Sequence, residues 1–413
     1  MKKTWPLPAL AALTAALLLS GCQQGIAQTS AHDEVKVSGA DVVTQGVDRN
    51  FGVSVDENGL FFMRPGDPLL RFYEYDTGKE AVLCDKAACT HSGKGCNAYV
   101  PETDLFGGYA CYRGTVYLAR RAQNADTLDL ISMDLGGNDR KSLASIPAGE
   151  DGWTLESVDA ASYAEGFAWL KVSYGKPADG GESERAEQLF AIDLAAGKVY
   201  PLTDRVGGGA RAEFEVVGSG HAIYQLIQGS KGTIWLFDTA EKKETIFWEG
   251  TLTDVFRPDD PGTLWYQAAP YLFEGIWGDK LVYDGAYQTG GEGSELYTYD
   301  LETKETAPLL TVENGGVMGR YMNGFNNMVY GDGQFYYLVY EGEDKCVIHR
   351  YDLDTGKDTP LFTDDRAVSF RVTSETSDKL VGTMNEGRDI CWIRKADYEK
   401  GDLSAAVVAF SQE

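Results

Sequence analysis

Short runs of alternating apolar and polar residues recur along this chain, and each run ends in an aspartate and a turn. In the clearest copy, residues 347–357, every second residue from Val347 to Leu353 falls on one face of a strand and the intervening residues are charged or polar. Asp354 and Gly356 follow, and they suit a tight turn because glycine accepts positive φ and aspartate can bond its own backbone. The pattern predicts a half-buried β-strand that leads into an antiparallel neighbour.

The run occurs seven times, and a second apolar or aromatic run stands upstream of most copies, as in Leu281–Tyr283 and Phe335–Tyr337. The aspartates that mark the copies are 45 residues (193 to 238) to 62 residues (238 to 300) apart, namely Asp76, Asp134, Asp193, Asp238, Asp300, Asp352 and Asp397. Two strong strands per unit, with room for two more, predict an all-β fold, a β-propeller with four-stranded antiparallel blades. One blade cannot bury both faces of its sheet, so the blades stack in a ring. Seven copies favour seven blades, and six or eight stay open because the end copies are degenerate.

An all-β sandwich is the alternative architecture, but a sandwich does not require a repeated Tyr-x-Tyr-Asp phrase. The run at 403–410 is predicted to complete a blade with N-terminal residues and so to close the ring. Loops between the two strong strands, such as 174–188 and 283–294, are predicted to open on one rim. An extra aromatic stretch, Thr253–Trp277, belongs to this set of candidate ligand-binding or core segments.

Residues 1–22 have the layout of a targeting segment. Lys2 and Lys3 precede an apolar run at 6–19 that is short for a membrane span. Leu19-Ser20-Gly21-Cys22 then resembles the lipobox of bacterial lipoproteins, which implies diacylglycerol transfer to the Cys22 sulfur and cleavage before it. A plain secretory leader is the alternative. We expect 1–22 to be a lipoprotein signal peptide, 23–40 a flexible tether and 41–413 a single propeller domain.

The formal net charge is −26. Such a surface repels nucleic acid and anionic headgroups, so nucleic acid is not an expected partner and the lipid is the expected membrane contact. Simple solubility of an exported chain explains the charge equally well. We expect a monomer on the extracytoplasmic face of the cell membrane, at the cell surface.

An insertion at 84–111 carries the only constellation with chemical character, Cys84, Cys89, His91 and Cys96, in the spacing C-x4-C-x-H-x4-C. Three thiolates and one imidazole would make a tetrahedral structural zinc site with no open position. Disulfides are the alternative outside the membrane, since six cysteines remain besides Cys22 and Cys111 could pair with the cluster.

Two further cysteines, Cys346 and Cys391, stand six residues before their repeat aspartates. They therefore occupy equivalent positions in neighbouring blades and are expected to be core thiols. Other motif searches give no haem, zinc-protease, nucleophile-elbow or P-loop pattern, and the four histidines give little support to a histidine-based hydrolase.

Gly278-Asp-Lys-Leu-Val-Tyr283 and Leu296-Tyr-Thr-Tyr-Asp-Leu301 resemble the repeats of TolB-like and YWTD-like propellers. The lipobox together with the cysteine cluster and Asn97-Ala98-Tyr99 is similar to a group of uncharacterised propeller lipoproteins of anaerobic bacteria. The resemblance implies fold and surface placement, and no activity or functional residues. We expect a binding or scaffolding module for a protein, peptide or glycan on the loop rim, without catalysis. The alternative is an extracytoplasmic carbohydrate-active enzyme, a polysaccharide lyase or glycosidase, with its site in the central funnel.

Overall fold

The computed structural model describes residues 44–45, 53–64, 66–101, 104, 106–121, 127–147, 152–177, 183–256, 264–285, 293–318, 320–322, 325–327, 331–365 and 368–411. The expected signal peptide, the tether and Cys22 lie outside these residues. Within them, no helix is long and apolar enough to cross a membrane.

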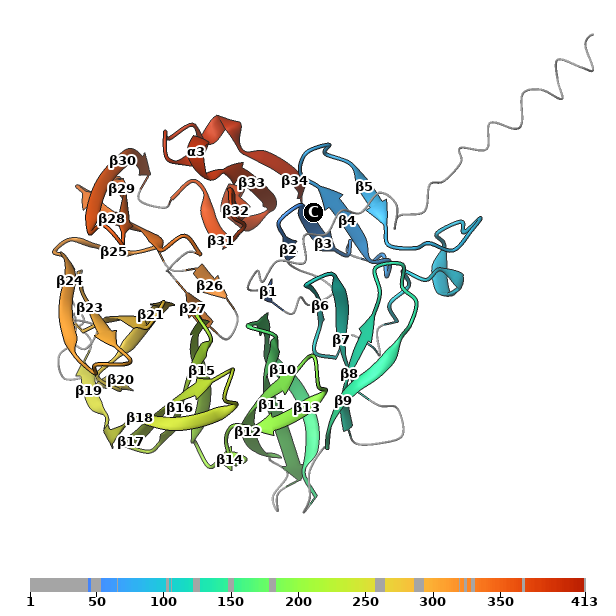
Figure 1. Cartoon of the computed structure of the whole chain (residues 1–413), viewed down its shortest axis with the longest axis horizontal. Helices are drawn as coiled ribbons and strands as arrows, with labels where there is room; N and C mark the ends of the chain where they lie inside the picture. Colours follow the sequence, from blue (N-terminus) through green and yellow to red (C-terminus); the bar gives the residue numbers. More distant parts are fainter. Residues whose placement is uncertain are drawn as a thin grey trace, which may run out of the picture.

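Seven consecutive antiparallel sheets form the ring in Figure 1, which confirms the seven-bladed propeller. Blade 1 consists of β2 (Ser54–Asp56), β3 (Gly59–Phe62), β4 (Arg71–Glu74) and β5 (Glu80–Val82). Blade 2 consists of β6 (Tyr109–Tyr112), β7 (Thr115–Arg121), β8 (Thr127–Met133) and β9 (Lys141–Pro147). Blade 3 consists of β10 (Thr154–Ala164), β11 (Phe167–Pro177), β12 (Ser183–Asp193) and β13 (Lys198–Pro201). Blades 4 and 5 are built from β15 (Arg211–Gly218), β16 (His221–Gln228), β17 (Lys231–Asp238) and β18 (Lys243–Thr251); β21 (Leu272–Trp277), β22 (Lys280–Asp284), β23 (Ser294–Asp300) and β24 (Thr306–Val312). Blades 6 and 7 are built from β25 (Gly315–Val317), β28 (Gln334–Glu341), β29 (Lys345–Asp352) and β30 (Lys357–Asp365); β31 (Arg371–Glu375), β32 (Lys379–Met384), β33 (Asp389–Arg394) and β34 (Val407–Ser411).

Helical structure among the described residues is confined to short pieces. These are the 3₁₀ turns η1 (Gly93–Gly95), η4 (Asn385–Gly387) and η5 (Leu403–Ala405) and the one-turn helix α3 (Lys395–Tyr398).

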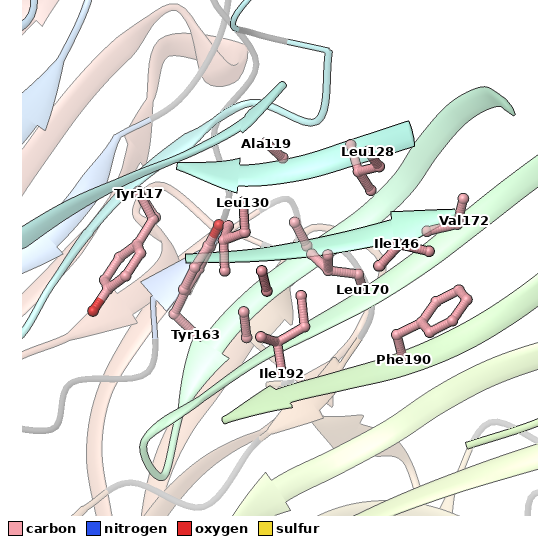
Figure 2. Close-up of a cluster of buried hydrophobic side chains, with 14 of the residues drawn as sticks. Tyr117, Ala119, Leu128, Leu130, Ile146, Tyr163, Leu170, Val172, Phe190 and Ile192 are labelled. Carbon is pink, nitrogen blue, oxygen red and sulfur yellow. The ribbon is translucent and has the colours of Figure 1, made fainter. Parts of the chain in front are cut away.

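Each blade buries both faces of its sheet against its neighbours. In β28, Phe335 and Tyr337 pack toward blade 5, and Tyr336 between them packs toward blade 7. Figure 2 shows the same arrangement between blades 2 and 3, where Leu128 and Leu130 meet Leu170 and Ile192. Successive side chains along a strand therefore point toward the two neighbouring blades in turn, so the period of two in the sequence distinguishes the two neighbours as well as core from solvent positions.

Antiparallel alternation assigns each connection to one of two rims. The connections between second and third strands, and those from one blade to the next, share one rim, which we call the loop rim. The tight Asp-Gly turns between third and fourth strands lie on the opposite rim, as in Asp352–Gly356, where the Gly356 N–H donates to the Asp352 carbonyl.

Ring closure differs from the sequence prediction. The run at 403–410 does not share a blade with N-terminal residues, because β34 pairs with β33 and blade 7 consists of residues 371–411 alone. The seam with blade 1 is closed by side chains: the Phe62 and Phe410 rings stack at 4.5 Å, and Glu57 accepts hydrogen bonds from the Ser377 N–H and hydroxyl. Blade 1 supplies its own inner strand, β2, so no vacant strand position is left for the C-terminus.

One predicted loop is also corrected, and the extra aromatic stretch supplies core residues as one of its two expected roles. Residues 174–177 and 183–188 are strand, because β11 and β12 continue in register from Phe167↔Asp193 out to Pro177↔Ser183. The aromatic stretch 253–277 divides into an extra hairpin, β19 (Thr253–Phe256) with β20 (Leu264–Ala268), and β21, the inner strand of blade 5. Tyr271 and Phe273 pack in the core between blades 4 and 5.

Additional segments lie inside the ring, next to its inner strands (Figure 1). β1 (Thr44–Gln45) pairs with β10 and also contacts β2 and β6. The hairpin β26 (Arg320–Met322) and β27 (Phe325–Asn327), which follows β25, contacts β15 and β21 through β27 and β31 through β26. β1 and the β26–β27 hairpin therefore contact several of the inner strands of the blades.

Candidate metal centre and buried carboxylates

The four predicted ligands come together at the outside of the ring, in the segment between blades 1 and 2. The Cys84, Cys89 and Cys96 sulfurs and an imidazole nitrogen of His91 all lie within 4.8 Å of one another. The Cys96 sulfur is 3.6 Å from the His91 Nδ1. Tetrahedral zinc with its usual Zn–S and Zn–N distances separates such a pair by about 3.6 Å. The arrangement could hold a metal ion.

Backbone N–H groups point at the sulfurs. The His91 N–H donates to the Cys89 sulfur at 3.4 Å, and the Lys86 and Ala98 N–H groups bond the Cys84 and Cys96 sulfurs. Each bond thus comes from the residue two positions after the cysteine. Positive φ at His91 and Gly93 lets the chain wrap around the cluster. Donors aimed at sulfur stabilise thiolates, the form that binds metal.

The thiols differ in their proton affinity. Burial raises the pKa of the Cys84 thiol, but the N–H groups of Lys86 and Asn97 and the neighbouring thiols more than offset it, so its pKa lies below the ordinary value. Burial raises the pKa of Cys96 to about 12, and the neighbouring thiols add to the rise. Of these two thiols, Cys84 therefore loses its proton more readily than Cys96.

The six described cysteines are all free thiols in this structure. Cys111 lies in β6, where its backbone exchanges hydrogen bonds with the Ser54 hydroxyl, and it does not join the cluster. Cys346 and Cys391 are fully buried in the core between blades 6 and 7. Among the described residues, the cysteine and histidine side chains that converge are thus those of Cys84, Cys89, His91 and Cys96.

The cysteine cluster is connected to blade 2 by hydrogen bonds. The Asn97 side-chain amide donates to Asp85 and, at 2.7 Å, to Asn138, whose own amide donates to Asp85 at 2.7 Å. Arg140 donates to the backbone carbonyls of Asn97 and Tyr99. The approach is close: a Cβ at Gly137, where φ is +79°, would lie 2.2 Å from the Asn97 carbonyl oxygen. The segment 84–99, which carries the cysteines, therefore links blade 1 to blade 2, and we call this link the strut.

Replacing Asn138 with alanine should destabilise the chain by about 1–3 kcal/mol, because Asp85 and Asn97 each lose a half-buried hydrogen-bond partner. The urea midpoint of unfolding measures the effect, and metal content should stay that of the wild type. Lys141→Ala, an exposed change close by, is the control and should leave the midpoint unchanged. An equal midpoint for both variants would contradict the strut.

Two carboxylates that the sequence did not single out meet on the inner strands of blades 4 and 5. Glu215 and Glu274 each occupy the bulge of their strand, three residues before its last paired residue. Burial raises the pKa of each to about 8; Glu213 adds to the rise at Glu215, and Asp284 and then Glu215 add to it at Glu274. The Gln225 amide donates to Glu215. The sequence signal for this pair was that the two glutamates occupy equivalent positions in two repeats. It could not be recognised among the 63 acidic residues of the chain.

No family model matches the chain, and no curated protein matches it. Solved structures similar to it include an oligogalacturonate lyase in complex with manganese (12% identity, 85% of this chain and 87% of that one, TM-score 0.39). TolB from Acinetobacter baumannii is similar at 12% identity (85% and 76%, TM-score 0.32). The β-propeller domain of the Trilobed protease from Pyrococcus furiosus is similar at 11% identity (92% and 98%, TM-score 0.42). At these identities the likeness concerns the fold alone, and by fold this chain is a β-propeller.

Proposed function

We propose that this chain is a lipid-anchored extracytoplasmic propeller that binds a protein, peptide or glycan on its loop rim, and that zinc in the Cys3His cluster is structural. The observation that supports rim binding is that β1 and the β26–β27 hairpin contact inner strands of the ring, which favours the loops over the inner strands as the ligand-binding surface.

Zinc fits the donor set of the cluster. Three sulfurs and one imidazole are soft and borderline ligands, which suit Zn²⁺ and not the oxygen-seeking Mg²⁺ or Ca²⁺. The four protein ligands fill a tetrahedral shell, and the cysteine segment is fixed to blade 2 through Asn97 and Arg140. The metal would hold blade 1, whose strands have only three or four residues, against its neighbour.

Anchoring rests on the lipobox. In cells fed a labelled fatty acid, the full chain should carry label and stay with the membrane fraction, and Cys22→Ala should lose both. A wild-type chain released without label would overturn the anchor and leave rim binding untouched.

Rim binding is tested by probing peptide and glycan arrays with the folded domain, residues 41–413. Reproducible binding to one ligand class that is abolished by substitutions on the loop rim, and unaffected by substitutions in the opposite turns, is the expected result. Binding that responds only to the turn substitutions would contradict the proposal.

The enzyme alternative has one observation in its favour, the Glu215 and Glu274 pair near the axis. Two carboxylates can divide acid and base roles in sugar chemistry. However, β27 contacts both strands that carry them, and Glu215 is buried. Release of reducing ends or unsaturated products from a polysaccharide panel, lost in Glu215→Gln, would favour this alternative.

A further inference from the structure

Three separate segments of the loop rim converge at the end of blade 3. Trp153 immediately precedes β10, Tyr174 and Lys176 lie near the end of β11, and Arg205 precedes the short strand β14 (Val206–Gly207). The pairing of β14 with β12 brings Arg205 to this place, since Ala186 pairs with both Tyr174 and Gly207.

The two cations of this group are held by aromatic rings. The guanidinium carbon of Arg205 lies 4.2 Å from the centroid of the Tyr174 ring and 5.7 Å from that of Trp153. The Lys176 ammonium lies 5.9 Å from the Trp153 centroid. Such contacts orient a cation without neutralising it. Among the described residues, neither Arg205 nor Lys176 forms a salt bridge.

Two donors in the group have no acceptor in the part of the chain that the structure describes. The Tyr174 hydroxyl is one: the side chain is fully buried and its O–H has no acceptor. The Arg205 Nε–H, also buried, is the other. Buried polar groups without partners are few in folded proteins and each needs a cause. The Tyr75 and Tyr163 hydroxyls also lack a partner, but in this group two donors lie together and could both bond one ligand oxygen.

The contrast with Arg71 supports this interpretation. The Arg71 Nε–H is also buried without a partner, but the Arg71 guanidinium is neutralised by Asp67 at 2.6 Å and Glu80 at 2.5 Å, whereas no carboxylate of a described residue neutralises Arg205. Burial also raises the pKa of Tyr174 to about 12, against the opposing effect of Arg205, so the hydroxyl stays a donor at neutral pH.

We propose that Trp153, Tyr174, Lys176 and Arg205 form a subsite for the carboxylate of a ligand bound on the loop rim. The inference deepens the proposed rim binding and rests on it. The guanidinium offers a fork that matches a carboxylate, with the Tyr174 hydroxyl as a third donor and Lys176 as a second positive charge. Trp153, which is half-buried, leaves part of its ring for the apolar side of the same ligand.

The net charge of the chain further restricts the class of ligand that the subsite suits. A net charge of −26 repels a polyanion, so the subsite suits a ligand that is neutral apart from its carboxylate. A sugar acid and a peptide C-terminus both present this group, and the experiment separates them.

The test is a ligand-observed NMR titration of the folded domain, residues 41–413, with two matched pairs of probes. Methyl glucuronoside is compared with methyl glucoside, and acetyl-glycyl-alanine with its C-terminal amide. We expect one of the two carboxylates to bind and its neutral partner not to. Arg205→Gln should weaken that binding at least about tenfold, because a charged hydrogen-bonded pair is lost.

Arg185→Gln is the matched control. It removes the same charge from the neighbouring strand β12, where Arg185 is exposed and pairs with Glu156, and it should leave binding unchanged. Tyr174→Phe should keep the melting temperature of the free domain, since its O–H donates to no acceptor among the described residues, and should still weaken binding.

Equal binding of carboxylates and neutral probes, equal loss in the Arg205 and Arg185 variants, or no binding of any probe would overturn the subsite. Ligand binding on the arrays that survives Arg205→Gln would overturn the subsite alone and leave the proposed rim function standing.

Discussion

If the cluster holds zinc as proposed, replacing Cys89 with serine should release the metal from the folded domain and lower its stability by about 4 kcal/mol or more, because loss of a metal is among the mutations with the largest effects on stability. Cys89 is one of four ligands whose atoms lie within 4.8 Å of one another, and the segment that carries them otherwise holds few buried apolar residues. Without the ion, the remaining thiols stay close together with no positive charge between them. The measurement is metal content per chain by mass spectrometry, together with the thermal unfolding midpoint, on domain purified anaerobically without chelator.

Cys346→Ser is the matched control. That thiol is fully buried between blades 6 and 7, so the variant should lose stability but keep its full metal content. About one zinc per wild-type chain is the expected stoichiometry. A wild-type chain with no metal and few titratable thiols after denaturation would contradict the metal centre and indicate a disulfide-bonded cluster.

The free energy of unfolding should fall as the pH rises from about 5 to 9, by roughly 2–4 kcal/mol, because of Glu215 and Glu274. Their pKa in the folded chain is about 8, above the ordinary 4.5, mainly through burial. Between these values the folded state keeps protons that the unfolded state has released, so rising pH favours unfolding. The stabilising effect of the two protonated groups is complete below pH 4.5 and is lost as the pH passes 8.

Chemical denaturation at a series of pH values measures this effect. Glu215→Gln keeps the contact with Gln225 and removes the titration, so its stability should vary less with pH and should exceed that of the wild type at pH 9. Glu302→Gln, at an exposed turn, is the control and should follow the wild type. A Glu215→Gln profile that runs parallel to the wild type would show that Glu215 does not titrate in this range.

The repeated strand pattern was sufficient to predict the propeller. A strand of period two that is apolar on both faces at some positions, as around Phe335–Tyr337, can be buried only by neighbours on both sides. Seven copies of the pattern then matched seven blades. The cysteine cluster was also visible in the sequence, because its four ligands lie within thirteen residues and local chain geometry alone can bring them together.

Other features depended on contacts between residues distant in sequence, which no local pattern encodes. The closure of the ring by packing of Phe62 on Phe410, in place of a shared strand, joins opposite ends of the chain. The Glu215 and Glu274 pair and the Arg205 site likewise arise where neighbouring strands and separate loops meet. The sequence by itself determined the repeating unit, favoured seven units and brought the four cysteine and histidine side chains of the cluster together, since these depend on hydrophobic periodicity and short-range geometry. Only the tertiary structure decided how the ring closes, which segments contact its inner strands and which of the described cations form no salt bridge, because burial and electrostatic pairing are properties of the packed ring.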